Sequence, residues 1–73
     1  MSNEFIPIES KMLKEAKYDP ITLTLTVRFK TNNSLYELYD VPKFVFEAML
    51  AAESCGSYYH NHLKHKYRTQ RIE

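Results

Sequence analysis

The chain has 73 residues, of which 44% are hydrophobic, and its formal net charge is +1. The length allows one domain, which we expect to span residues 1–73 with an ordered core from about 8 to 69. The small net charge excludes a globally basic nucleic-acid-binding protein. Cys55 is the only cysteine, so no disulfide can form within the chain. Because the start lacks a signal-peptide pattern and no apolar run approaches the roughly 20 residues of a membrane span, we expect a soluble, cytoplasmic protein.

Two interpretations remain open for the first third of the chain. Residues 11–17 are good helix formers. The same stretch also fits a period-two alternation as far as Tyr18, and Asp19-Pro20 is typical of a turn. The alternation would make residues 10–18 the first strand of a meander.

Residues 21–30 carry the clearest pattern in the chain. Apolar and polar residues alternate there, which predicts a strand with one face on the core; the apolar positions are Ile21, Leu23, Leu25, Val27 and Phe29. Residues 31–34 are typical of a turn, and a second strand is predicted from residue 35 to about 41. We expect an antiparallel hairpin in which Tyr36 and Leu38 share a face.

Two helices are predicted after this hairpin. Pro42 ends the strand, and apolar residues then recur at helical spacing as far as about Ser54; they are Phe44, Val45, Ala48, Met49 and Ala52. Gly56, the only glycine, is expected to end this helix in a left-handed conformation. Ser57 is expected to cap a second helix, on which Tyr59, Leu63 and Tyr67 pack against the core.

A run rich in cations and aromatic rings occupies residues 54–71. Cations follow a phosphate backbone and aromatic faces stack on bases, so this run is a candidate nucleic-acid contact. The expected stacking residues are Tyr58 and His62, and the expected phosphate contacts are Lys64, Lys66, Arg68 and Arg71. The alternative is a solvated helix face that binds nothing.

Tyr36 and Arg28 are a second candidate contact, on the hairpin. Bases stack on aromatic residues of an exposed sheet in several RNA-binding modules, and Arg28 of the neighbouring strand would complete such a platform. The alternative is a cross-strand pair that only stabilises the hairpin.

The histidines and the cysteine do not predict a metal site or a catalytic site. His62 and His65 fall on one side of the predicted helix, but the same segment contains no close acid or cysteine to complete a metal site. Cys55 with His60 or His62 lacks a third, orienting group. We therefore expect no metal, no cofactor and no enzymatic activity.

Several stretches, in their order and spacing, resemble the KTSC domain family over roughly residues 8–69. They are Tyr18-Asp19-Pro20, Val27-Arg28-Phe29, Tyr36 followed by Val41-Pro42, Ala52-Glu53-Ser54 with Gly56, and residues 58–67. The family is named for a domain at the C-terminus of some lysyl-tRNA synthetases and includes free-standing bacterial and phage proteins. One departure is Leu38, which stands at the second position of the family's usual Tyr-x-Tyr motif and would weaken a ligand-stacking surface on the sheet.

The resemblance implies a β-β-β-α-α order, which favours a strand for residues 10–18. We expect an α+β fold: a three-stranded antiparallel β-meander followed by two C-terminal α-helices packed on one face. The resemblance also implies RNA binding, so the expected function is a non-catalytic module that binds RNA or another nucleic acid. The alternative is a module for a protein partner or a small anionic ligand such as a nucleotide. Phe5, Ile6 and Ile8 would then form an apolar interface, and the chain would be a monomer or a weak homodimer.

Overall fold

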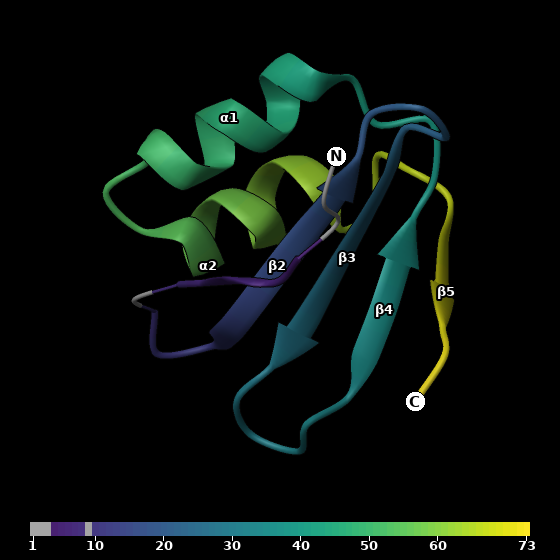
Figure 1. The fold of residues 1–73 in the computed structure, drawn as a ribbon. Coiled ribbons are helices and arrows are strands. Elements are labelled where there is room, and N and C mark those ends of the chain that lie inside the picture. The colour runs from purple at the N-terminus through teal and green to yellow at the C-terminus, as the bar shows by residue number, and fades with distance from the viewer. Residues whose placement is uncertain (1–3, 9) are drawn as a thin grey trace.

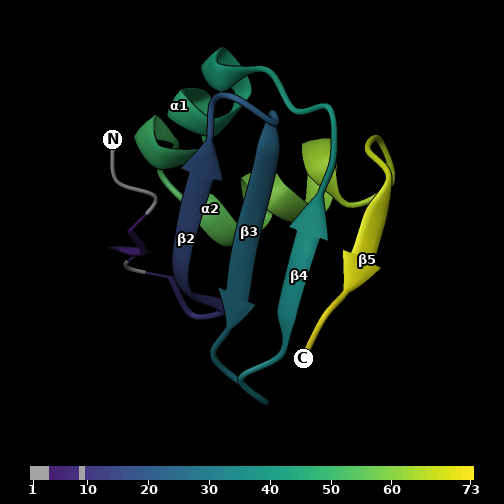
Figure 2. The ribbon, with the colours of Figure 1, turned by 45° about the vertical axis from the view of Figure 1, so that its right-hand side comes forward.

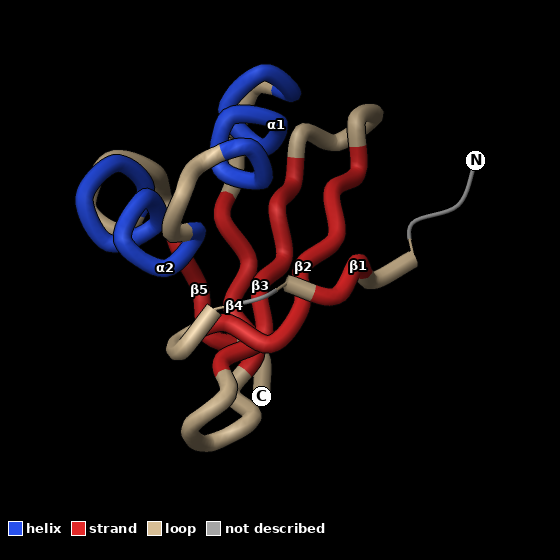
Figure 3. The backbone as a smooth tube through the Cα atoms, turned by 90° about the vertical axis from the view of Figure 1, so that its left-hand side faces the viewer, coloured by secondary structure: helices blue, strands red, loops and turns tan. Residues whose placement is uncertain are grey.

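The computed structural model describes residues 4–8 and 10–73, which form an α+β fold around a five-stranded antiparallel sheet (Figure 1). The sheet order follows the chain: β1 (Ile6–Pro7), β2 (Leu13–Asp19), β3 (Thr24–Phe29), β4 (Leu35–Leu38) and β5 (Thr69–Arg71). Helix α1 (Lys43–Ala51) and helix α2 (Cys55–Tyr58), which continues into the π-helical segment η1 (Tyr59–Leu63), lie together on one face of the sheet (Figure 3). No helix in this described part is long and apolar enough to cross a membrane.

The centre of the sheet confirms the predicted strands. Residues 10–18 were open between helix and strand, and most of them form β2. Ala16 pairs with Val27, and Val27 pairs with Tyr36, so all three side chains point to the same face. Ala16 and Val27 are fully buried there, which makes this the face covered by the helices. The opposite face carries mostly polar side chains, among them Lys17, Arg28 and Glu37, and is called the open face below.

The β2–β3 turn is longer than the alternation predicted. Ile21, expected in the strand, is 87% exposed, and Leu23 adopts a left-handed backbone with φ of 57°. The Asp19 carboxylate accepts hydrogen bonds from the backbone N–H groups of Ile21 (2.9 Å) and Thr22 (3.4 Å). These bonds hold the residues after Asp19 in a turn, although their apolar and polar side chains continue the alternation of the strand. β3 therefore begins at Thr24 rather than at residue 21.

Helix α1 buries a different stripe from the one predicted. Val45 and Met49 are buried as expected, but Phe44 is 71% exposed. Phe46 takes its place in the core, where its ring stacks on Tyr18 with centroids 5.3 Å apart. The helix also ends at Ala51, earlier than Ser54.

Gly56 and Ser57 have other roles than the predicted helix junction. Gly56 does not adopt a positive φ, and it lies inside α2 against the segment that enters β2. The cap of α2 is Ser54, whose hydroxyl accepts a hydrogen bond from the N–H of Ser57 (3.2 Å). The chain thus needs glycine for a close approach, since a Cβ at Gly56 would lie 2.9 Å from the Ser10 Oγ atom.

The first and last strands, β1 and β5, were not predicted. The second helix was expected to continue through Tyr67, but the chain turns after η1 and returns beside β4 as the edge strand β5 (Figure 2). Backbone hydrogen bonds from Tyr39 N to Arg68 O (2.9 Å) and from Ile72 N to Leu35 O (2.8 Å) hold this strand. The predicted three-stranded sheet is therefore too small.

The N-terminal segment does not present the predicted apolar interface. Ile8 is buried and Ile6 is 43% exposed. The Phe5 ring lies under two cations of the open face, 4.8 Å from the Lys17 Nζ and 5.7 Å from the Arg28 Cζ.

Candidate nucleic-acid interface

A groove with a volume of about 390 Å³ lies between η1 and the end of the sheet at the β3–β4 turn. Strands, turn and helix all contribute to its lining. We call it the Tyr36 groove, and its lining residues are Met12, Phe29, Thr31, Asn32, Tyr36, Tyr59, His60, Lys64, His65 and Thr69.

Aromatic rings form the floor of the Tyr36 groove. The Phe29 ring meets Tyr36 edge to face at 5.4 Å and meets Tyr59 in the same manner at 5.5 Å, measured between centroids. Tyr59 is buried, which raises the pKa of its hydroxyl above the ordinary value, and Tyr36 adds a smaller effect in the same direction. Tyr36 is only half-buried and lines the groove.

Titratable and polar side chains form the rim. Lys64 follows η1, where its N–H bonds to the Tyr59 carbonyl at 2.9 Å in an i to i+5 pattern. His60 and His65 flank it, and all three side chains are exposed. Thr69 of β5 and Asn32 of the β3–β4 turn add neutral hydrogen-bonding groups. The groove therefore combines an apolar floor with a polar rim that carries one cation, Lys64, and this combination suits a base linked to a phosphate.

Arg71 adjoins this groove. It pairs directly with Tyr36 across the β4–β5 ladder, so the two side chains lie on the same face of the sheet. The Arg71 Nε donates a hydrogen bond to the Glu73 carbonyl oxygen at 3.0 Å. The ion pairs between side chains of the described residues both involve Arg28, so neither Arg71 nor Lys64 has a side-chain carboxylate partner there.

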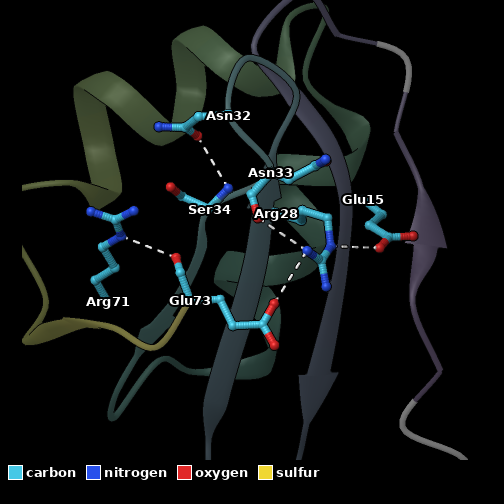
Figure 4. A network of polar contacts seen from close by, with 7 residues as sticks. All are labelled: Glu15, Arg28, Asn32, Asn33, Ser34, Arg71 and Glu73. Atoms are coloured by element: carbon cyan, nitrogen blue, oxygen red, sulfur yellow. Dashed lines mark hydrogen bonds and ion pairs between the residues drawn. The ribbon is translucent and has the colours of Figure 1, made fainter.

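Arg28 is not part of a platform with Tyr36, contrary to the sequence-based prediction. Arg28 pairs with Leu35, one residue before Tyr36, and consecutive residues of a strand point to opposite faces. On the open face its guanidinium bonds to Glu15 Oε2 (3.0 Å), to Glu73 Oε1 (3.5 Å) and to the Asn33 carbonyl oxygen (3.0 Å), as Figure 4 shows. These contacts give Arg28 a structural role.

The remaining predicted residues lie outside the groove lining. Tyr58 and His62, one helical turn apart, stack on each other with ring centroids 4.6 Å apart and planes tilted by 42°. Lys66 and Arg68 are exposed in the segment between η1 and β5. Leu38, where the family motif has its second tyrosine, is fully buried in the core. Its departure therefore changes packing rather than an exposed stacking surface.

The sequence predicts only Tyr36 and Lys64 among the ten residues that line the groove. His60 and His65 are considered there only as metal ligands or a catalytic base, although their place beside Lys64 in a cationic run is a usable signal. Asn32 and Thr69 gave no signal, because their approach to the groove depends on the β3–β4 turn and on β5. Among the described residues no three His, Cys, Asp or Glu side chains gather to hold a metal ion, and the Cys55 thiol is buried.

Comparisons with known proteins place the same segment in one family. The KTSC domain model matches residues 9–67. A protein from Tsukamurella paurometabola is 40% identical over 62 residues, covering 85% of this chain and 91% of that protein. A lysine–tRNA ligase from Trichormus variabilis is 36% identical over 64 residues, which are 88% of this chain but only 11% of the ligase. The crystal structure of a KTSC domain protein from Yersinia pestis has the same fold, with a TM-score of 0.90 at 23% identity, covering 96% of this chain and 97% of that one.

Proposed function

Because this chain belongs to the KTSC domain family, we propose that it is a non-catalytic module that binds single-stranded RNA in the Tyr36 groove. One base stacks on the exposed part of the Tyr36 ring, and Lys64 and Arg71 contact the phosphates on either side of it. Lys66 and Arg68 contact the backbone farther along, and Tyr58 with His62 offers a second stacking surface. The observation that carries the proposal is that a half-buried aromatic ring and an unpaired cation line the same groove.

The charge arrangement supports a phosphate-bearing ligand. The nine acidic and ten basic residues of the chain nearly balance, yet Lys64 and Arg71 have no side-chain carboxylate partner among the described residues. Three to four phosphate contacts on a single strand would give a log–log salt slope of about −2 to −3. The proposal therefore requires weak binding that falls measurably with salt.

The comparisons support RNA as the class of nucleic acid. Two relatives, from Trichormus variabilis and Nostoc sp., are by name lysine–tRNA ligases, so segments like this one occur within proteins named for a tRNA. The chain spans 11% of the length of each ligase, and the activity of the whole ligase is not carried over to it.

Titration of a labelled oligoribonucleotide at about 50 mM and about 200 mM salt tests the proposal. Lys64→Gln should weaken binding and reduce the salt slope by about 0.7, the share of one phosphate contact on a single strand. Tyr36→Leu should cost about 1–3 kcal/mol of binding free energy, the usual worth of one base stacked on an aromatic ring. Thermal unfolding of each variant separates a lost contact from a lost fold.

Lys43→Gln is the matched control for removal of charge. Lys43 is exposed at the start of α1, at the end of the sheet opposite the β3–β4 turn (Figure 1). Its variant should keep the wild-type affinity. Absence of binding at low salt, or equal affinity in Lys64→Gln and Lys43→Gln, would sink the proposal.

A second candidate is a mononucleotide, and the concavity of the site favours it. The groove volume of about 390 Å³ lies within the range of small-molecule sites. Adenosine 5′-monophosphate should then bind as tightly as the oligoribonucleotide and displace it fully. If the oligoribonucleotide binds much more tightly, contacts beyond one nucleotide matter and RNA is the ligand.

A further inference from the structure

We infer that Ser34, Asn32 and Arg71 form a subsite for one phosphate group beside the Tyr36 groove, an inference that rests on the proposed function. The starting observation is the Ser34 hydroxyl. Ser34 is 2% exposed, and its Oγ has no hydrogen-bond partner within the described residues. Buried polar groups are nearly always paired, so an unpaired one needs an explanation.

Both backbone groups of Ser34 are hydrogen-bonded, so only its side-chain hydroxyl lacks a partner. The Ser34 carbonyl oxygen accepts a bond from the N–H of Phe29 (2.9 Å), and the Ser34 N–H donates to the Asn32 Oδ1 (3.1 Å). Ser34 directly precedes β4, and Figure 4 shows its hydroxyl on the side where the Asn32 amide and the Arg71 guanidinium lie. The unpaired hydroxyl therefore belongs to a residue that is hydrogen-bonded to Asn32, which lines the groove.

Asn32 supplies a second donor with a defined direction. Only the oxygen of its amide can accept the Ser34 N–H, so the amide nitrogen must point the other way. Figure 4 shows this nitrogen directed away from the strands, on the same side as the Ser34 hydroxyl. Asn32 also lines the Tyr36 groove, which makes the subsite continuous with the groove.

Arg71 supplies the charge. Its side chain extends toward Asn32 and Ser34 in Figure 4, and its Nε bond to the Glu73 carbonyl holds it along the sheet edge. The Glu73 carboxylate turns instead to Arg28 on the open face, 3.5 Å from its guanidinium. The Glu73 side-chain carboxylate is thereby directed away from Arg71.

A hydroxyl, an amide nitrogen and a guanidinium are all donors, and this combination recognises a phosphate oxygen. Asn32 and Arg71 are exposed side chains on either side of the covered Ser34 hydroxyl. In the proposed subsite these two exposed side chains turn toward the phosphate, and the Ser34 hydroxyl donates to it from between them. With Lys64 across the groove, one base at Tyr36 has a phosphate site on each side.

Ser34→Ala tests the subsite, because removal of an unpaired hydroxyl should not destabilise the fold. We expect unchanged or higher thermal stability, with affinity for adenosine 5′-monophosphate reduced about tenfold, the loss of one hydrogen bond to a charged group. Adenosine, which lacks the phosphate, should bind wild type and variant equally. Arg71→Gln should show the same selective loss, and Ser57→Ala, at an exposed serine of α2, should show none.

Three probes separate the sources of the phosphate: inorganic phosphate, adenosine 5′-monophosphate and an oligoribonucleotide, each followed by the amide resonances of residues 32–36. Loss of response in Ser34→Ala for all three supports the subsite. Equal affinity of wild type and Ser34→Ala for the two nucleotide probes, with affinity reduced only in Arg71→Gln, overturns the subsite and leaves the proposed function standing. If wild type binds neither nucleotide probe, the proposed function fails and the subsite fails with it.

Discussion

Replacement of Gly56 by alanine should destabilise the protein, although alanine is the better helix former. A Cβ at Gly56 would lie 2.9 Å from the Ser10 Oγ and 3.3 Å from the Met12 Cβ and Cε atoms. The Ser10 hydroxyl accepts hydrogen bonds from the N–H groups of Met12 (3.1 Å) and Leu13 (3.2 Å) where the chain enters β2. It cannot rotate away from a new Cβ without breaking these bonds.

The magnitude follows from these contacts. Loss of two backbone hydrogen bonds to Ser10 costs about 2 kcal/mol, and compression against Met12 adds up to about 1 kcal/mol. The helix propensity of alanine over glycine returns about 1 kcal/mol. The free energy of unfolding should therefore fall by about 1–2 kcal/mol, which moves the urea midpoint down by about 1 M for a chain of this size.

A double-mutant cycle with Ser10→Ala tests the reason as well as the size of the effect. Ser10→Ala removes the atom that would lie closest to the new Cβ at residue 56. In the Ser10→Ala protein, Gly56→Ala should therefore leave the free energy of unfolding almost unchanged or raise it. Equilibrium urea unfolding of the four proteins gives the coupling energy. A stabilising Gly56→Ala in the wild-type background, or an equal cost in both backgrounds, would refute the reasoning.

Three further predictions concern the core and the open face. Phe46→Ala should lower the free energy of unfolding by about 3 kcal/mol and Phe44→Ala by less than about 0.5 kcal/mol, because only Phe46 is buried; equal costs in urea unfolding would contradict the face assigned to α1. Burial, with a smaller effect of Asp19, raises the pKa of Tyr18 in the folded protein, so the folded state holds this proton more tightly than the unfolded chain. The resulting stabilisation is complete below the unfolded pKa of about 10 and is lost as the pH rises above it. In pH-dependent unfolding, Tyr18→Phe should therefore lose less stability at alkaline pH than the wild type. At neutral pH the same variant should cost about 1 kcal/mol, because the Val41 carbonyl loses its hydrogen-bond donor. Glu15→Gln should cost about 0.5–1 kcal/mol at low salt and less at about 1 M salt, and a salt-independent cost would show that the Arg28 pair is not electrostatic.

The parts of the fold that the sequence predicts are those in which local pattern and burial agree. Leu25 and Val27 alternate with threonine and arginine and are fully buried, so β3 could be predicted from its own residues. The face of α1 could not, because Phe44 and Phe46 are both compatible with a helical stripe that includes Val45 and Met49. The choice between them is made by Tyr18, which offers a ring for Phe46 to stack on.

The edge strand β5 could not be predicted, because its three residues, Thr69–Arg71, are all exposed and lack any apolar alternation. The candidate site was only half predicted, because part of it depends on this strand. Without β5, nothing in the sequence places Arg71 opposite Tyr36. Tyr36 and Lys64 were chosen separately, one from a strand and one from a charged run, and only the tertiary fold brings them to one groove.

The late position of β5 has a consequence for the timing and dynamics of the site. β4 and β5 are neighbours in space but are separated in the chain by both helices, so their pairing closes a long loop and should follow helix docking. An exposed edge strand is also among the first elements to open in a native protein. Thr69 and Arg71 belong to this strand, so the groove should be lost by partial opening well before the core unfolds. A ligand bound there would slow hydrogen exchange first in β5, whose three residues are all exposed.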